Sequence, residues 1–154
     1  MRYDYCMIYY FDSPFGTVSY DWNGNVCRQI WLQRHGDQQS EHDDPVSLWL
    51  QHWFDGHAAP LPPLIPPATQ FQAKMRPALL AIPAGETSTY GEIARQLGTS
   101  ARAMGQALGA NPLPLLIPCH RVVAADGIGG FACGLRWKKK LLQFEANLLT
   151  ASTA

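Results

Sequence analysis

Residues 89–109 read TYGEIARQLGTSARAMGQALG and carry the signals of two short helices in succession. Thr89 and Glu92 have the spacing of a capping box, in which each side chain accepts a hydrogen bond from the other residue's backbone N–H. The first helix is therefore predicted to begin after Thr89 and to run to Leu97. Gly98 is predicted to end it, because glycine readily adopts the left-handed backbone of a helix C-terminus.

The second helix is predicted over 101–108, with Thr99 or Ser100 as its N-cap. Two short helices joined by a tight turn form a helix-turn-helix pattern, which occurs in DNA-binding proteins and in ordinary helical hairpins. Arg102 and Gln106 lie four residues apart and share one face of this helix. The other positions are mostly small: Ala101, Ala103, Gly105, Ala107, Gly109 and Ala110. Such a helix can lie against a phosphate backbone or pack tightly against another helix.

Residues 117–123 read IPCHRVV and indicate a reactive cysteine. A cysteine reacts as its thiolate, so it needs a nearby base and positive charge to lose its proton near neutral pH. His120 and Arg121 directly follow Cys119 and supply both. Free cysteines are also common as inert core residues, so the cysteine–histidine pair alone leaves both interpretations open.

A third helix is predicted over 135–149, and it carries a carboxylate in its apolar stripe. Glu145 lies four residues from Leu141 and four from Leu149. A buried carboxylate is costly without a partner, which predicts a buried partner, with an imidazole as the natural candidate. The alternative is that this end of the helix frays and Glu145 stays in water.

The first part of the chain favours a small antiparallel sheet. Three strands are predicted, over 7–11, 17–22 and 26–32, with turn residues at 12–16 and 23–25. A short helix over 45–54 follows a polar loop. Five prolines between positions 60 and 67 exclude a helix or a central strand, so this segment is predicted to be an extended linker.

These features predict an α+β fold with two domains. Residues 1–66 would form a small N-terminal antiparallel β-sheet domain with the proline-rich linker at its end, and residues 67–154 a mostly helical domain that contains the helix-turn-helix. A helix is predicted over 69–80, kinked or broken near Pro77, because proline lacks the N–H that continues a helix.

Charge is distributed unevenly although the net charge is zero. Residues 1–66 carry three basic and eight acidic side chains, and residues 67–154 carry nine basic and four acidic ones. The basic half favours an anionic partner such as nucleic acid.

No segment resembles a signal peptide or a membrane span, so we expect a soluble intracellular protein, cytoplasmic or, in a eukaryote, nuclear, with reduced cysteines. No C-x-x-C pair or other metal-site spacing is present, and we expect no metal.

Residues 71–145 resemble the O6-alkylguanine-DNA alkyltransferase family of DNA-repair proteins. The resemblance lies in FQ at 71–72, AL at 78–79, IPAGET at 82–87, YGEIA at 90–94, ARA at 101–103, Gly105, NP at 111–112, Pro114, IPCHRV at 117–122, and LL at 141–142 with Glu145. It covers about half of the chain, and the N-terminal half matches more loosely. It implies stoichiometric transfer of an alkyl group, such as methyl, from O6-alkylguanine to one cysteine, without a cofactor.

The resemblance also implies catalytic roles. Cys119 would accept the alkyl group, His120 would act as base through a water, and Glu145 would orient the imidazole. Asn111 would brace the turn of the active site, and Tyr90 would contact the flipped base and its 3′ phosphate. Flipping is required because the target base lies inside a stacked duplex.

The implied DNA contacts lie on the second helix and near the cysteine. Arg102 would fill the gap left by the flipped base, with the helix in the minor groove of double-stranded DNA and little dependence on sequence. The other DNA contacts would be Ala101, Ala103, Gln106, Tyr90 and Arg121. The substrate pocket would be lined by Leu108, Val122, Phe131, Ala132 and Cys133. The protein is expected to act as a monomer.

The sequence departs from the family pattern in the loop over 126–134, which is one residue shorter. Phe131 stands where tyrosine is frequent, and Cys133 stands where glycine is usual, so bulky adducts are less expected than methyl. The main alternative is a damage sensor that flips O6-alkylguanine without transfer, although such relatives lack the acceptor cysteine. A helix-turn-helix transcription regulator and a thiol hydrolase are weaker alternatives.

Overall fold

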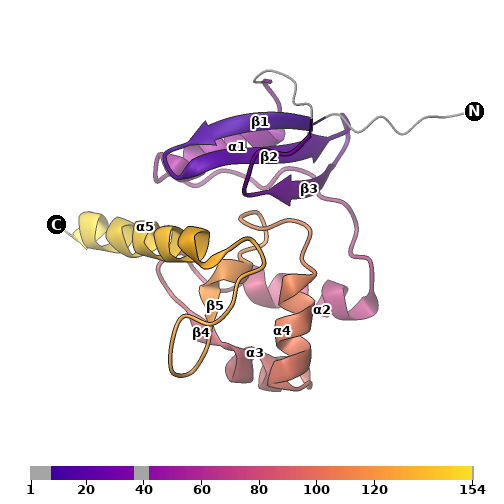
Figure 1. The fold of residues 1–154 in the computed structure, drawn as a ribbon, viewed down its shortest axis with the longest axis vertical. Helices are drawn as coiled ribbons and strands as arrows, with labels where there is room; N and C mark the ends of the chain where they lie inside the picture. The colour runs from indigo at the N-terminus through magenta and orange to yellow at the C-terminus, as the bar shows by residue number, and fades with distance from the viewer. Residues whose placement is uncertain (1–7, 37–41, 154) are drawn as a thin grey trace, which may run out of the picture. The chain divides into compact units, whose positions relative to one another are not determined.

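The computed structural model describes residues 8–36 and 42–153 (Figure 1). The chain divides into two compact units, Met1–Ile65 and Pro66–Ala154. The described residues have an α+β fold, which confirms the predicted fold class. In the described part of the chain, no helix combines the length and the apolar character that a membrane crossing needs.

The first unit contains a three-stranded antiparallel sheet and one helix (Figure 1). Its elements are β1 (Ile8–Ser13), β2 (Gly16–Trp22), β3 (Cys27–Trp31) and α1 (Pro45–Phe54). The first turn is tighter than predicted, because Ser13 pairs with Gly16 across a two-residue loop. The Ser13 hydroxyl donates to the Gly16 carbonyl at 2.6 Å and closes this turn. The predicted start of the first strand at residue 7 and part of the polar loop, 37–41, lie outside the described residues.

Helix α1 covers the range that the sequence predicts and is tied to the sheet by its N-cap. The Asp44 carboxylate accepts from the Ser47 backbone N–H at 2.8 Å. The same carboxylate accepts from the Tyr20 hydroxyl of β2 at 2.6 Å. Val46 and Leu50 of α1 and Ile30 of β3 are buried and contribute to the core of this unit.

The proline-rich segment is extended, and it also pairs with the edge of the sheet. The Cys27 N–H donates to the Pro63 carbonyl at 2.8 Å, and the Ile65 N–H donates to the Cys27 carbonyl at 2.9 Å. Leu64 thereby forms a parallel bridge with Cys27. The sequence predicts the extended backbone but not this pairing, which depends on where the first residue of β3 lies in space.

The second unit is mostly helical and contains a small parallel sheet. Its elements are α2 (Gln70–Leu80), β4 (Ser88–Thr89), α3 (Tyr90–Leu97), α4 (Ala101–Gly109), the 3₁₀ turn η1 (Cys119–Arg121), β5 (Val122–Val123) and α5 (Leu135–Thr153). Strands β4 and β5 pair in parallel, Ser88 with Val122 and Thr89 with Val123. The sequence reasoning missed this sheet.

Helices α3 and α4 form the predicted helix-turn-helix (Figure 1). The Thr89 N–H donates to Glu92 at 2.8 Å and the Glu92 N–H donates to Thr89 at 3.1 Å, which confirms the capping box. Gly98 ends α3 with a left-handed backbone of φ 70°. Ser100, and not Thr99, caps α4 by accepting from the Ala103 N–H at 3.1 Å.

Helix α2 runs through Pro77 without a break, so of the two predicted outcomes, a kink or a break, the break is wrong. Proline removes one helical hydrogen bond, which leaves the carbonyl of Ala73 without its usual donor. Both residues lie on the exposed side of α2, where water can satisfy that carbonyl. Met75, Ala78 and Leu79 occupy the opposite, buried face.

Candidate active site

Cys119, the candidate nucleophile, follows a turn between α4 and β5 that side-chain hydrogen bonds hold in place. Asn111 holds this turn, because its side-chain N–H donates to the Ile117 carbonyl at 3.1 Å and its carbonyl accepts from the Leu113 N–H at 3.1 Å. Leu115 adopts a left-handed backbone, with φ 76°, and is buried. A non-glycine residue in this conformation is strained, and dense packing must hold it in place. The turn leads directly to Cys119.

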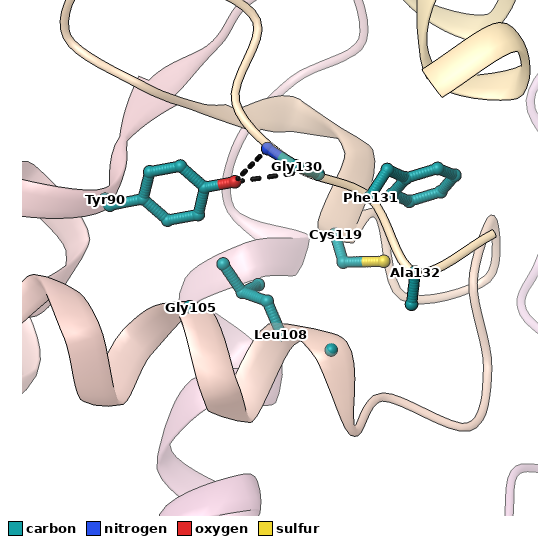
Figure 2. A pocket seen from close by; sticks show the side chains of 8 residues that line it. Tyr90, Gly105, Leu108, Cys119, Gly130, Phe131 and Ala132 are labelled. Atoms are coloured by element: carbon teal, nitrogen blue, oxygen red, sulfur yellow. Dashed lines mark hydrogen bonds between the residues drawn. The ribbon is translucent and has the colours of Figure 1, made fainter. Parts of the chain in front are cut away.

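Cys119 borders a cavity of about 310 Å³. Cys119 lies on the side of η1 that faces α4 and the loop before α5. Its sulfur points toward Phe131 and Ala132 (Figure 2). The lining residues are Tyr90, Gly105, Leu108, Gly109, Cys119, Gly130, Phe131 and Ala132. Cys119 is only 7% exposed, so a reagent must enter this cavity to reach the sulfur.

Behind the cysteine lies a buried ionic cluster of His120, Glu145 and Arg121. The His120 Nε2 and Glu145 Oε1 atoms are 2.9 Å apart. The Arg121 Nε donates to the same carboxylate at 3.0 Å and 3.1 Å, and its Nη2 donates at 2.5 Å. Exposed fractions are 0% for His120 and 1% for Glu145. The carboxylate in the apolar stripe is therefore buried and has the imidazole partner that the sequence predicts.

The charges in this cluster favour a neutral imidazole beside an ionised carboxylate. Burial lowers the pKa of His120, and the Arg121 and Lys138 charges act in the same direction against the opposing effect of Glu145. Burial alone would raise the pKa of Glu145, but its hydrogen bonds to His120 and Arg121 outweigh burial and lower that pKa. A neutral imidazole can accept a proton, and the adjacent carboxylate stabilises the imidazolium that results.

The buried surroundings of Cys119 favour its protonated thiol over the thiolate. Burial raises its pKa to about 11, while the Asn111 hydrogen bond and the Lys138 charge lower it in part. A thiol with this pKa is a poor nucleophile at neutral pH. Its reaction near neutral pH therefore requires a base, and His120 is the next residue in the sequence.

Lys138 is a buried lysine that the sequence reasoning did not single out. Its ammonium donates to the carbonyls of Val122 and Gly130, each at 2.8 Å, and its side chain is fully buried. It also lies 5.7 Å from the centre of the Tyr90 ring. The Tyr90 hydroxyl in turn accepts from the Gly130 N–H at 3.1 Å (Figure 2). Lys138 and Tyr90 together fix the loop at Gly130 over the cavity.

The predicted DNA-contacting residues separate into two groups. Ala101, Arg102 and Gln106 are exposed on α4, and Ala103 is partly exposed, so this face is accessible. Arg121 points inward instead, since it binds Glu145 and donates from Nη1 to the Ile82 carbonyl at 2.7 Å. The Arg121 side chain therefore has internal partners, and its contact with DNA stays a prediction.

Only some of the predicted pocket residues line the cavity. Leu108, Phe131 and Ala132 line the cavity, whereas Val122 and Cys133 are not among its lining residues. Val122 is buried beneath the site, and its carbonyl receives Lys138. Gly105 and Gly109 of α4 line the cavity and were not predicted to do so, whereas Gly130 lies in the loop over 127–134, which the resemblance implies as part of the pocket. The small-residue pattern of α4 was the available signal, but it did not reveal that this face borders a cavity.

A candidate metal centre is not part of this site. Among residues 8–36 and 42–153, no three His, Cys, Asp or Glu side chains are grouped so that they could hold a metal ion.

The fold and the site define a class: helix-turn-helix proteins with a buried cysteine beside a histidine–carboxylate pair. Residues 70–147 match the family model for "6-O-methylguanine DNA methyltransferase, DNA binding domain". This match spans half of the chain, and the chain therefore belongs to the 6-O-methylguanine DNA methyltransferase family, as the resemblance predicts.

Curated relatives match the same half of the chain. The methylated-DNA–protein-cysteine methyltransferase of Methanocaldococcus vulcanius is 49% identical over 77 residues, which are 50% of this chain and 48% of that protein. The enzyme of the same name from Metallosphaera sedula is 55% identical over 65 residues, 42% of each chain. The matched region thus spans about half the length of these relatives, or less.

A solved structure resembles nearly the whole chain. It is the structure of Mycobacterium tuberculosis OGT in complex with DNA, with a TM-score of 0.78 and 32% sequence identity. The similarity covers 92% of this chain and 93% of the Mycobacterium protein. The first unit, which the family model does not reach, is therefore included in the structural similarity.

Proposed function

We propose that this protein repairs DNA by transferring an alkyl group, in particular methyl, from the O6 atom of alkylguanine to Cys119. Membership of the family supports this activity. The observation that carries it is the position of Cys119, which borders a cavity while its neighbour His120 is paired with a buried carboxylate. A thioether is not easily cleaved, so each molecule acts once.

The transfer is a displacement at carbon. The sulfur of Cys119 forms a bond to the alkyl carbon as the bond from that carbon to O6 breaks, and the electron pair of the broken bond goes to guanine. His120 takes the thiol proton through a water, and Glu145 stabilises the imidazolium. Arg121 supports the reaction indirectly, because it holds Glu145 ionised.

Access to the damaged base requires its rotation out of the duplex. Arg102 enters the space that the base leaves and offsets part of the cost of unstacking, which is a few kcal/mol. The small side chains of Ala101 and Ala103 let α4 approach the minor groove, with Gln106 at its edge. Tyr90 contacts the flipped nucleotide at the mouth of the cavity.

We assign these functions to residues 67–154, as the acceptor and DNA-binding domain, and treat residues 1–66 as a separate N-terminal domain with the proline-rich linker. The partner is double-stranded DNA that contains O6-alkylguanine. The protein acts as a monomer inside the cell, where its DNA substrate is located.

The test is intact-protein mass spectrometry after mixing with a duplex that contains one O6-methylguanine. The expected result is one added methyl group on Cys119, at most one per protein molecule, and no addition to Cys119→Ser or with an undamaged duplex. Binding of the damaged duplex by the unmodified protein, with no gain of mass, would replace the proposal with the damage-sensor function.

A further inference from the structure

Helix α5 lies in close contact with the turn over residues 82–86, which follows α2 and leads to β4. The Glu86 N–H donates to the Pro83 carbonyl at 3.1 Å and closes this turn. Gly85 within it has a left-handed backbone, with φ 90°, a conformation that glycine adopts more readily than any other residue. The backbone therefore gives one reason for glycine at this position.

The lack of space for a side chain gives a second reason. A Cβ atom placed on Gly85 would lie 2.5 Å from both Cγ and Cδ1 of Leu149, and 3.3 Å from the carbonyl oxygen of Glu145. Non-bonded carbon atoms pack at roughly 3.5–4.0 Å, so both contacts with Leu149 are clashes. A side chain at position 85 would force Leu149 into another rotamer or push α5 away from the turn.

The part of α5 that meets Gly85 is the part that carries the buried carboxylate. Leu149 lies about one helical turn beyond Glu145, whose Oε1 atom is 2.9 Å from Nε2 of His120. The turn over 82–86 also contacts this cluster at its other end, because the Arg121 Nη1 donates to the Ile82 carbonyl at 2.7 Å. The turn therefore contacts both α5 and the guanidinium that binds Glu145.

The surroundings of this contact leave α5 room to move. A second cavity, of about 550 Å³, is lined by Gly85 and Thr87 and, from α5, by Leu142, Glu145 and Ala146, among others. Dense packing on this side would hold the helix in place, but a cavity of this size does not. The close approach at Gly85 is therefore important for the position of Glu145.

We propose that Gly85 is a positioning residue for the His120–Glu145 pair. Its missing side chain lets α5 lie close enough to the turn for the Glu145 carboxylate to reach the imidazole. Gly85 acts through Glu145 and not on the reacting atoms. The contact depends only on the fold, whereas its effect on repair rests on the proposed alkyl transfer.

The test measures the rate at which iodoacetamide labels Cys119 at neutral pH in the full-length protein, with peptide mass spectrometry to identify the labelled cysteine. Gly85→Ala should slow this labelling about tenfold, because a displaced carboxylate stabilises the imidazolium less. Gly85→Ala combined with Leu149→Ala should recover most of the rate, because the side chain that the added carbon meets is gone. Leu149→Phe crowds the same contact without changing the backbone at residue 85, and it should also slow labelling.

Gly98→Ala is the matched control. Gly98 also has a positive φ, of 70°, but a Cβ atom there would meet no other atom within 4 Å. This variant has the same kind of backbone strain without the clash, so it should label at the wild-type rate.

A further comparison separates positioning from a general loss of stability. If Gly85 acts through Glu145, then adding Gly85→Ala to Glu145→Gln should slow labelling no further. Single-turnover methyl transfer from O6-methylguanine should follow the same pattern. Urea unfolding shows which variants are folded under the conditions of the assay.

Wild-type labelling rates for Gly85→Ala and Leu149→Phe would show that the leucine moves aside and would overturn the proposal. An equal loss in Gly98→Ala, or a further loss when Gly85→Ala is added to Glu145→Gln, would also overturn it. The expected labelling pattern in a protein that transfers no methyl group would retain the role of Gly85 and reject the alkyl-transfer function. The labelling and transfer assays therefore fail independently.

Discussion

The Glu145 carboxylate binds two partners behind the acceptor, the His120 imidazole and the Arg121 guanidinium. A neutral side chain of the same size would keep the packing but would no longer stabilise an imidazolium. It would also leave the partly buried Arg121 guanidinium without its counter-charge, which destabilises the folded protein. Glu145 thus couples the reactivity of the thiol to the stability of the second unit.

Replacing Glu145 with Gln should slow the reaction of Cys119 with iodoacetamide at neutral pH, and methyl transfer should fall about 10- to 100-fold. The physical reason is the weaker base at His120. Labelling rates and single-turnover transfer rates measure the two effects. Glu86→Gln is the matched control, since Glu86 is exposed in the same unit. Equal labelling rates for the wild-type protein and Glu145→Gln would show that Glu145 does not assist the deprotonation of Cys119.

Single residues also show where sequence reasoning stops. Glu145 was identifiable because a carboxylate in an apolar stripe violates the helix pattern. Lys138 was not, because it begins a run of three lysines that resembles a solvated helix face. Its burial follows from the carbonyls of Val122 and Gly130, whose positions only the folded loop determines. The ion pair of Arg121 with Glu145 was likewise not predictable, since the two residues are 24 positions apart.

Among the elements, those with local signals were predicted and those with distant partners were not. Helices α1, α3 and α4 begin at caps that are visible in the sequence and end at or near the predicted residues. The β4–β5 sheet has two residues in each strand, and its partners are 34 positions apart, Ser88 with Val122. Such short strands carry no periodicity of their own.

Arg102 on the exposed side of α4 gives a test of how this helix acts on duplex DNA. Arg102→Ala should slow repair of O6-methylguanine in a duplex about tenfold, but should leave reaction with the free alkylated base nearly unchanged, because only the duplex has a gap to fill. Single-turnover rates on the two substrates give the comparison. Arg95→Ala on α3 is the control. If both substrates lost rate equally, Arg102 would not act on the duplex.

For the molecule as a whole, the buried His120–Glu145 pair makes stability depend on pH. The pKa of His120 is lower in the folded protein, so below its ordinary value of 6.5 the unfolded chain binds the proton more readily. The pKa of Glu145 is also lowered, so the ionised carboxylate adds stability that is lost as the pH falls below about 4.5. Both shifts act in the same direction, and acid weakens the fold.

The free energy of unfolding should therefore be constant from about pH 8 to pH 7 and should decrease between about pH 6.5 and pH 5. Urea unfolding followed by tryptophan fluorescence at several pH values measures this change. The variant His120→Gln lacks the titrating ring and should show a weaker decrease over the upper part of that range. A wild-type protein that was equally stable at pH 5 and pH 7 would contradict the prediction.

The proline-rich segment beside β3 has a consequence for the behaviour of concentrated protein. A free strand edge offers a row of amide donors that can recruit another chain and begin a fibre. Here Pro63 to Ile65 occupy the edge at Cys27. The prolines of this segment, Pro62, Pro63, Pro66 and Pro67, have no amide hydrogen to donate to another strand. The β3 edge is thereby closed to another strand at Cys27.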